Sequence, residues 1–151
     1  MPNKLPLATL IELAQNKTDA ATRRLGQLQN AHTSAAGKLD LLQQYRQEYM
    51  AQLQVHLQDG VAAANLRNFQ QFISTLDTAI EQQRALTSQA DSRLAHGRSD
   101  WQHSKHRLNS FDTLAERVHQ QEIVALNRRE QRDCDERTAR QFYLRSSAAT
   151  E

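Results

Sequence analysis

The fold is decided at a short break between two helical patterns, His56-Leu57-Gln58-Asp59-Gly60-Val61-Ala62-Ala63-Ala64-Asn65. On both sides of this break, apolar residues recur every three and four positions, which is the period of helices that bury a narrow seam against each other. The break is the only good place for the chain to turn back. The expected organisation is a single coiled-coil domain over 1–151, with a first helix over 7–57, a turn over 58–64, a second helix over 65–142 and a disordered tail over 143–151.

The composition favours long helices over a compact globule. Aromatic residues make up 5% of the chain, with four Gly and two Pro, whereas Gln, Ala, Leu, Arg and Glu are abundant. Pro2 and Pro6 both lie at the N-terminal edge, so no interior residue forces a helix to stop. Pro6 is a favourable residue for the first turn of the first helix.

The charge balance argues against a nucleic-acid partner. The 19 basic and 17 acidic residues give a net charge of +2, which is too weak a basic excess to neutralise a phosphate backbone. No apolar run is long enough to span a membrane, and the first residues lack a secretory apolar core, so we expect a cytoplasmic protein. The lone Cys134 lies among charged residues and is expected to be an exposed, reduced thiol.

Two sets of heptad positions, called a and d, form the expected seam. In the first helix they are Ile11, Thr18, Leu25, His32, Leu39, Arg46 and Leu53 (a), and Leu7, Ala14, Ala21, Leu28, Ala35, Leu42, Tyr49 and His56 (d). In the second helix they are Ile73, Ile80, Thr87, Leu94, Trp101 and Leu108 (a), and Phe69, Leu76, Gln83, Ala90, Gly97, Ser104 and Phe111 (d).

An antiparallel pair places a positions level with d positions, so the numbers of facing residues add to a constant. A constant of about 122 pairs Thr18 with Ser104 and Leu25 with Gly97, with small side chains opposite large ones. A constant seven lower also gives acceptable layers. In the first register Arg24 falls beside Asp100, where an exposed ion pair could form.

The first register leaves the end of the second helix without a partner. Leu7 lies level with about Ala115, so the chain beyond about Val118 overhangs while staying compatible with a helix to about Phe142. The expected fold class is all-α: a long two-helix antiparallel coiled coil, or αα-hairpin, with an overhanging C-terminal helix.

The two sides of the seam differ near the turn. The apolar flank carries Tyr45, Phe72, Ala79 and Leu86, and the polar flank carries Gln43, Gln70, Asp77 and Arg84. Apolar flanking residues can simply widen the buried stripe of a helix pair. They can also form an exposed patch that binds a partner. The pattern is consistent with both interpretations.

No catalytic or cofactor motif is found. The glycines are isolated, so there is no phosphate-binding loop. His103 and His106 lie three residues apart near Asp100, but without a fourth ligand a solvated helix surface is the favoured interpretation. We therefore expect a protein that is not an enzyme and uses no metal or cofactor.

Residues 42–49, the Asp59-Gly60 turn and residues 68–82 closely resemble the FliJ family of bacterial flagellar export proteins. The most specific similarities are the Tyr45 and Tyr49 pair and the Gln-Gln-Phe cluster that ends at Phe72. The resemblance covers residues 7–84 well and weakens beyond residue 107.

The resemblance implies a non-enzymatic stalk of the flagellar type III export apparatus, similar to the two-helix coiled coil of the rotary ATPase gamma subunit. Such a stalk would insert into the hexameric export ATPase, promote its assembly and activity, and couple it to the cytoplasmic domain of the membrane export gate. It would also bind export chaperones. The implied location is the cytoplasm, in peripheral association with the inner membrane at the flagellar base.

The resemblance also implies a set of gate-binding positions. Tyr45, Phe72 and Ala79 are expected to be the exposed contacts, above a ridge shaped by other members of the set. Lys38 and Gln83 depart from the family pattern. The full set that matches is Leu42, Tyr45, Tyr49, Phe72, Leu76 and Ala79.

Two other functions fit the same sequence. One is an escort whose main surface binds substrate-loaded export chaperones. The other is a plain structural coiled coil, either a homodimer or the equivalent component of a related secretion system. Stimulation of a purified ATPase would favour the stalk, whereas a dimer with an extended chain through Gly60 would favour the structural coiled coil.

Overall fold

A computed structural model describes residues 6–148 of the chain. Over this range the chain forms two α-helices, α1 (Leu7–Asp59) and α2 (Ala63–Ala148), and no strand. The carbonyl of Pro6 accepts a hydrogen bond from the Leu10 N–H at 3.0 Å, so the helical bonding begins at the expected proline. The all-α class and the antiparallel helical hairpin are confirmed.

The turn is shorter than the expected 58–64. The helix α1 ends at Asp59, and Gly60 follows with a φ of +86°, the left-handed conformation that commonly closes a helix. The second helix begins at Ala63, and the carbonyl of Ala62 accepts its first bond, from the Leu66 N–H at 3.1 Å. A single glycine stops the first helix, and the alanines that follow favour immediate helix formation.

The second helix is longer than expected. It continues to Ala148, so residues 143–148, which were expected to belong to a disordered tail, are helical. The chain has no Gly or Pro after Gly97, and Arg140 pairs with Glu136 one turn earlier at 2.6 Å. The rest of the expected tail, residues 149–151, lies outside the described residues.

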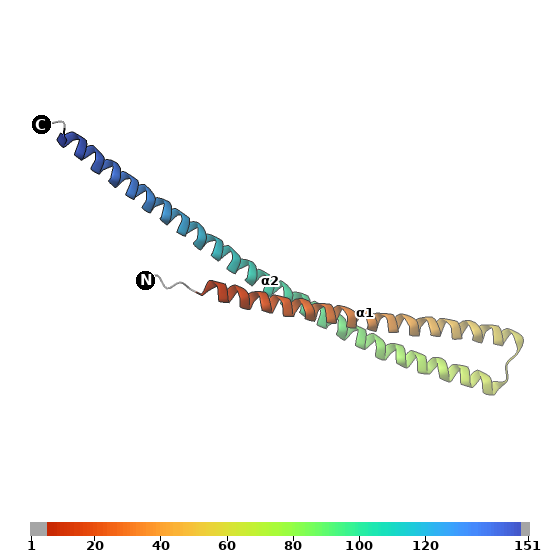
Figure 1. Ribbon diagram of the computed structural model, residues 1–151. Coiled ribbons are helices and arrows are strands. Elements are labelled where there is room, and N and C mark those ends of the chain that lie inside the picture. The colour runs from red at the N-terminus through yellow and green to blue at the C-terminus, as the bar shows by residue number, and fades with distance from the viewer. Residues whose placement is uncertain (1–5, 149–151) are drawn as a thin grey trace. The chain divides into compact units, whose positions relative to one another are not determined.

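The described chain falls into two compact units. One is Gln15–Lys105, in which residues 15–59 of α1 and 63–105 of α2 run antiparallel, side by side, on either side of the turn (Figure 1). The other contains residues 6–14 together with residues 106–148. That residues 1–151 behave as one coiled-coil domain stays a prediction.

The seam positions of Gln15–Lys105 are those that lose their exposure to solvent. The most buried are Leu94 (3%), Ile80 (5%) and Thr18 (5%), and nearly all other expected a and d residues in this unit are buried or half-buried. His56 is the exception, because it is exposed in the last turn of α1, with its ring centroid 5.4 Å from that of Phe69.

The register with a constant of about 122 is confirmed. Thr18 Oγ1 donates a hydrogen bond to the Ser104 carbonyl at 3.3 Å. A Cβ atom built on Gly97 would lie 3.7 Å from Leu25 Cδ1, so the expected partners of Gly97 and Thr18 are both in place. In the alternative register, in which the numbers of facing residues add to a constant seven lower, Ser104 would instead lie level with Ile11.

The ion pairs between the helices differ from the expected one. Among the described residues, Arg24 and Asp100 form no ion pair, and Arg46 pairs with Asp77 across the helices instead, at 2.5 Å. Arg24 and Asp100 are both exposed. At such positions hydration competes with pairing, so a suitable register alone does not produce a contact.

In the other unit, burial ends where the register predicts. Ala14 and Leu108 are 6% and 4% exposed, and Phe111 and Ala115 are half-buried. Every described residue from 116 to 148 is exposed, which agrees with the expected loss of a first-helix partner near Ala115. Among the described residues, no helix is long and apolar enough to cross a membrane.

Candidate partner-binding surface

The apolar flank lies exposed beside the seam of Gln15–Lys105. Tyr45 on α1 is 46% exposed, and Phe72 and Leu86 on α2 are 41% and 54% exposed. The expected exposure of Ala79 is wrong, because this residue is half-buried. Alanine has only a methyl side chain, so the larger neighbours carry most of the exposed apolar surface. Flanking residues that only widened a buried stripe would lose this exposure.

The ridge beneath the flank is packed against the seam. Leu76 is 7% exposed, and Leu42 and Tyr49 are half-buried. The ring centroids of Tyr49 and Phe72 lie 4.3 Å apart with 35° between their planes. This contact between the helices holds Phe72 in place while leaving much of its ring open to solvent. A side chain ordered before binding loses less entropy when a partner covers it.

The two departures from the family pattern occupy different environments. Lys38 is exposed on α1. Gln83 is half-buried in the seam, where its Nε2 donates a hydrogen bond to the Ala35 carbonyl at 3.0 Å. The carboxamide of Gln83 is therefore used inside the helix pair, and Lys38 is the departure that is accessible to a partner.

An aromatic groove adjoins the apolar flank near the turn. It has a volume of about 310 Å³ and is lined by Tyr49, Phe72, Phe69, Asn65 and Asn68. Sequence reasoning missed the asparagines, although Asn65 lies one heptad before Phe72 on the same helix face.

Leu41 was missed as well. It is 47% exposed and lies one turn before Tyr45. The spacing of four residues was a usable signal for its place beside the flank.

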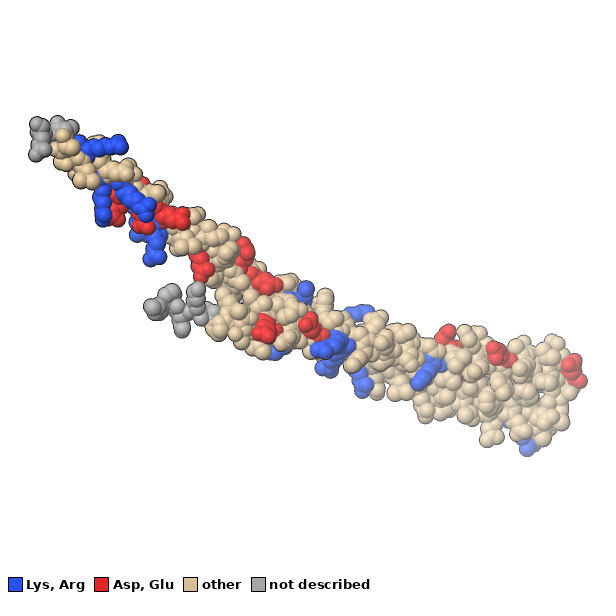
Figure 2. Space-filling view, in the orientation of Figure 1, with Lys and Arg blue, Asp and Glu red and all other residues tan. Residues whose placement is uncertain are grey.

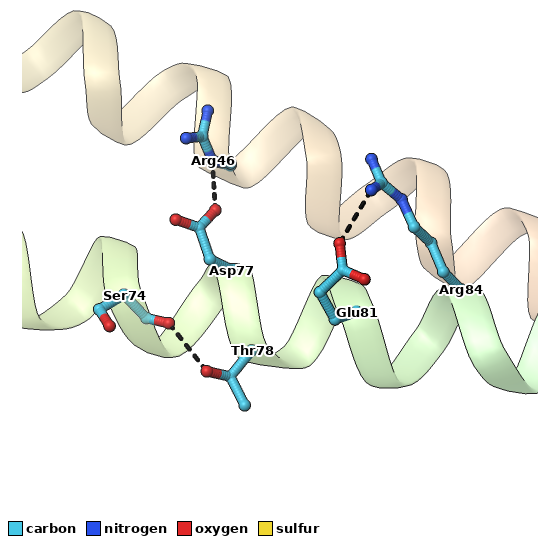
Figure 3. A network of polar contacts seen from close by, with 6 residues as sticks. All are labelled: Arg46, Ser74, Asp77, Thr78, Glu81 and Arg84. Atoms are coloured by element: carbon cyan, nitrogen blue, oxygen red, sulfur yellow. Dashed lines mark hydrogen bonds and ion pairs between the residues drawn. The ribbon is translucent and has the colours of Figure 1, made fainter.

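The polar flank satisfies its own charges. Arg46 Nε donates to Asp77 Oδ1 at 2.5 Å, and Arg84 pairs with Glu81 at 2.9 Å along α2, as Figure 3 shows. Together with Gln43 and nearby residues, these side chains line an open polar groove of about 500 Å³. These charged side chains are paired and still partly exposed to water. The polar flank is therefore a solvated surface, in contrast to the apolar flank.

Charged side chains are unevenly distributed along the surface. In the view of Figure 2, the part of the molecule nearest the turn shows few Lys, Arg, Asp or Glu side chains, whereas the C-terminal part of α2 shows both signs intermixed. A region with few charges and exposed aromatic rings is typical of a protein contact surface.

The residues considered for metal binding do not form a site. Within residues 6–148, no group of three or more His, Cys, Asp or Glu side chains is placed to hold a metal ion. His103 and His106 are both exposed on α2. The expected exposure of Cys134 is confirmed.

Comparison with known proteins identifies relatives over most of the chain. The family model described as the flagellar FliJ protein matches residues 3–147. A flagellar FliJ protein of Salmonella typhi is 35% identical over 130 residues, which cover 86% of this chain and 88% of the relative. A flagellar FliJ protein of Escherichia coli strain K12 is 34% identical over 130 residues, with the same coverage of both chains.

Proposed function

Because the chain belongs to the flagellar FliJ family, we propose that it is a non-enzymatic stalk of the flagellar type III export apparatus. Family membership supports a role in flagellar export. As such a stalk, the protein binds the hexameric export ATPase, promotes its assembly and activity, and couples it to the cytoplasmic domain of the membrane export gate. It acts in the cytoplasm, held at the inner membrane of the flagellar base through these partners.

The proposed interaction with the export gate is supported by the exposed apolar flank. Tyr45 and Phe72 each keep more than 40% of their surface open to solvent, although both sit next to a seam that could have buried them. Aromatic anchors that are already ordered are the residues that most often dominate protein interfaces. The residues of the polar flank include no aromatic side chain, and its charged members are held in ion pairs.

The ATPase-binding part is supported by the exposed second half of α2. Residues 116–148 are helical but bury no side chain within the chain. Most of the stability of a helix in a protein comes from the packing of an apolar face against other parts of the protein. A surrounding ring of subunits would supply the packing it lacks, so we assign the interaction with the ATPase to this segment.

The gate interaction is tested by substituting both exposed aromatic residues. Tyr45→Ala with Phe72→Ala should keep the helical circular dichroism and abolish binding to a purified cytoplasmic fragment of the export gate. The matched control, Gln43→Ala with Gln70→Ala on the polar flank, should bind as the parent does. Undiminished binding by the folded aromatic variant would refute the assignment of this surface.

The ATPase interaction is tested separately with purified components. Adding the chain to the export ATPase should increase hexamer formation and ATP hydrolysis. A variant that ends after Val118 should stimulate neither and should still bind the gate fragment. Equal stimulation by the shortened variant would remove the role proposed for residues 119–148.

A second candidate function is an escort for export chaperones. Phe142, Tyr143 and Leu144 are 70%, 73% and 70% exposed on the helical end of α2, and they offer an apolar contact in the unit that does not contain the flank. Capture of purified export chaperones by the chain, lost in the triple alanine variant while ATPase stimulation persists, would favour this function. A structural coiled coil would instead dimerise in solution without affecting the ATPase.

A further inference from the structure

Two exposed cations continue the apolar flank away from the turn. Lys38 precedes Tyr45 by one heptad on α1, and Arg93 follows Leu86 by one heptad on α2, so each lies on the same helix face as its apolar neighbour. In the observed register Lys38 lies about level with residue 84, which places it close to Leu86 across the seam.

These cations differ from those of the polar flank in having no acidic partner. Within residues 6–148, neither Lys38 nor Arg93 takes part in an ion pair or side-chain hydrogen bond, whereas Arg46 and Arg84 each pair with a carboxylate. Lys38 and Arg93 are therefore two exposed, uncompensated cations beside the apolar flank, whereas the arginines of the polar flank are neutralised.

The nearest acidic residues along the chain do not neutralise this end. Asp40 lies two residues from Lys38 and accepts a hydrogen bond from Gln44 at 3.4 Å, and Asp91 lies 3.7 Å from the His32 ring nitrogen. Residues two apart on a helix do not share a face. Glu48 is exposed roughly 15 Å along the helix from Lys38. That spacing exceeds the screening length of about 8 Å at physiological salt.

Asp100 is the next acidic residue on the face of Arg93. It lies one heptad further along α2, which is roughly 10 Å at the helical rise. Arg93 therefore lies between the apolar flank and Asp100 along α2.

We propose that Lys38 and Arg93 form a cationic end of the apolar flank, and that the export-gate surface covering the flank carries carboxylates that pair with them. This inference rests on the proposed function, because it describes the partner of the same surface. The aliphatic stem of Lys38 can extend the apolar contact while its ammonium group reaches the edge of the interface. Charges at an interface rim chiefly set the association rate and the correct orientation of the partner.

The test measures the affinity of the full chain for the purified cytoplasmic fragment of the export gate. Lys38→Glu and Arg93→Glu should each raise the Kd by roughly three- to tenfold at low salt, mainly through slower association. Both effects should shrink as salt is raised. Lys38→Arg should retain the parental affinity. Arg67→Glu, an equal charge change at an exposed residue off the flank, should change the Kd by less than about twofold.

The possible outcomes separate this inference from the function on which it rests. If the Tyr45→Ala, Phe72→Ala variant loses binding while Lys38→Glu and Arg93→Glu bind as the parent does, the cationic end is refuted and the flank stands. Equal weakening by Arg67→Glu would also refute it, because the effect would then follow net charge. Parental binding by the folded aromatic variant would refute the proposed function itself.

Discussion

Gly97 gives the sharpest test of how closely the helices of Gln15–Lys105 pack. A Cβ atom at this position would lie 2.5 Å from Leu28 Cδ1 and 3.7 Å from Leu25 Cδ1. The first distance is shorter than real side chains tolerate, so Leu28 would have to move. At Gly26, by contrast, a Cβ atom would meet nothing within 4 Å. The same substitution at the two glycines therefore separates packing from helix propensity.

Leucine favours a helix over glycine by roughly 0.8 kcal/mol, and this gain applies at both sites. At Gly97 the added side chain also overpacks the seam against Leu25 and Leu28, at a cost of about 1–3 kcal/mol. The difference between this cost and the gain is a net destabilisation of about 0.2–2.2 kcal/mol for Gly97→Leu, whereas Gly26→Leu should stabilise the protein by up to about 0.8 kcal/mol.

Thermal unfolding followed by circular dichroism measures both variants. For a chain of this size, 1 kcal/mol corresponds to about 2–4 °C in Tm. Leu28→Ala should recover part of the loss caused by Gly97→Leu, because the two sites are in contact and their effects couple. If Gly97→Leu stabilises the protein as much as Gly26→Leu does, the close approach of the helices at this layer is refuted.

Four further predictions follow from single features of the chain. Gly60→Ala should lower the stability by about 1–2 kcal/mol, because Gly60 has a φ of +86° that an alanine adopts only with strain. An unchanged Tm would show that the turn takes another conformation. Asp77→Ala should cost no more than about 1 kcal/mol, since its pair with Arg46 is half-exposed, and a loss of several kcal/mol in urea unfolding would contradict this. Gln83→Leu should change the free energy of unfolding by no more than about 1 kcal/mol, because the lost hydrogen bond to Ala35 is offset by apolar burial. A larger loss in urea unfolding would show that the polar contact contributes more than the apolar burial does. Ending the chain after Val118 should leave the thermal transition in place while reducing the helical signal, since residues 119–148 bury nothing within the chain, and loss of the transition would contradict this.

The helices, the turn and the register were predictable because each depends on a repeated or local signal. The heptad pattern identifies the seam, and small residues opposite large ones select the register in which Thr18 faces Ser104. The end of burial near Ala115 follows from that register by simple counting. The heptad pattern alone left open whether Tyr45 and Phe72 are buried or exposed, and their exposure was expected only from the resemblance to the FliJ family.

The remaining features depend on side-chain geometry or on weak local preferences. Ala79 shares the heptad position of Phe72 but is too short to project from the pair, so equal positions did not give equal exposure. Gln83 turns its carboxamide into the seam to reach the Ala35 carbonyl, which a pattern of polar and apolar residues does not reveal. The helix α2 extends beyond the end that the sequence predicts, because helix formation in a polar segment depends on many small contributions, such as the Glu136–Arg140 pair.

The most direct test of the account is site-specific photo-crosslinking in flagellated cells. A photoreactive phenylalanine analogue placed at Tyr45 or Phe72 should form an adduct with the export-gate subunit. The same analogue at Gln43 or Gln70, on the opposite side of the helix pair, should form none. Adducts of equal yield from both sides, or no gate adduct from the apolar flank, would contradict the claim that this flank is the docking surface.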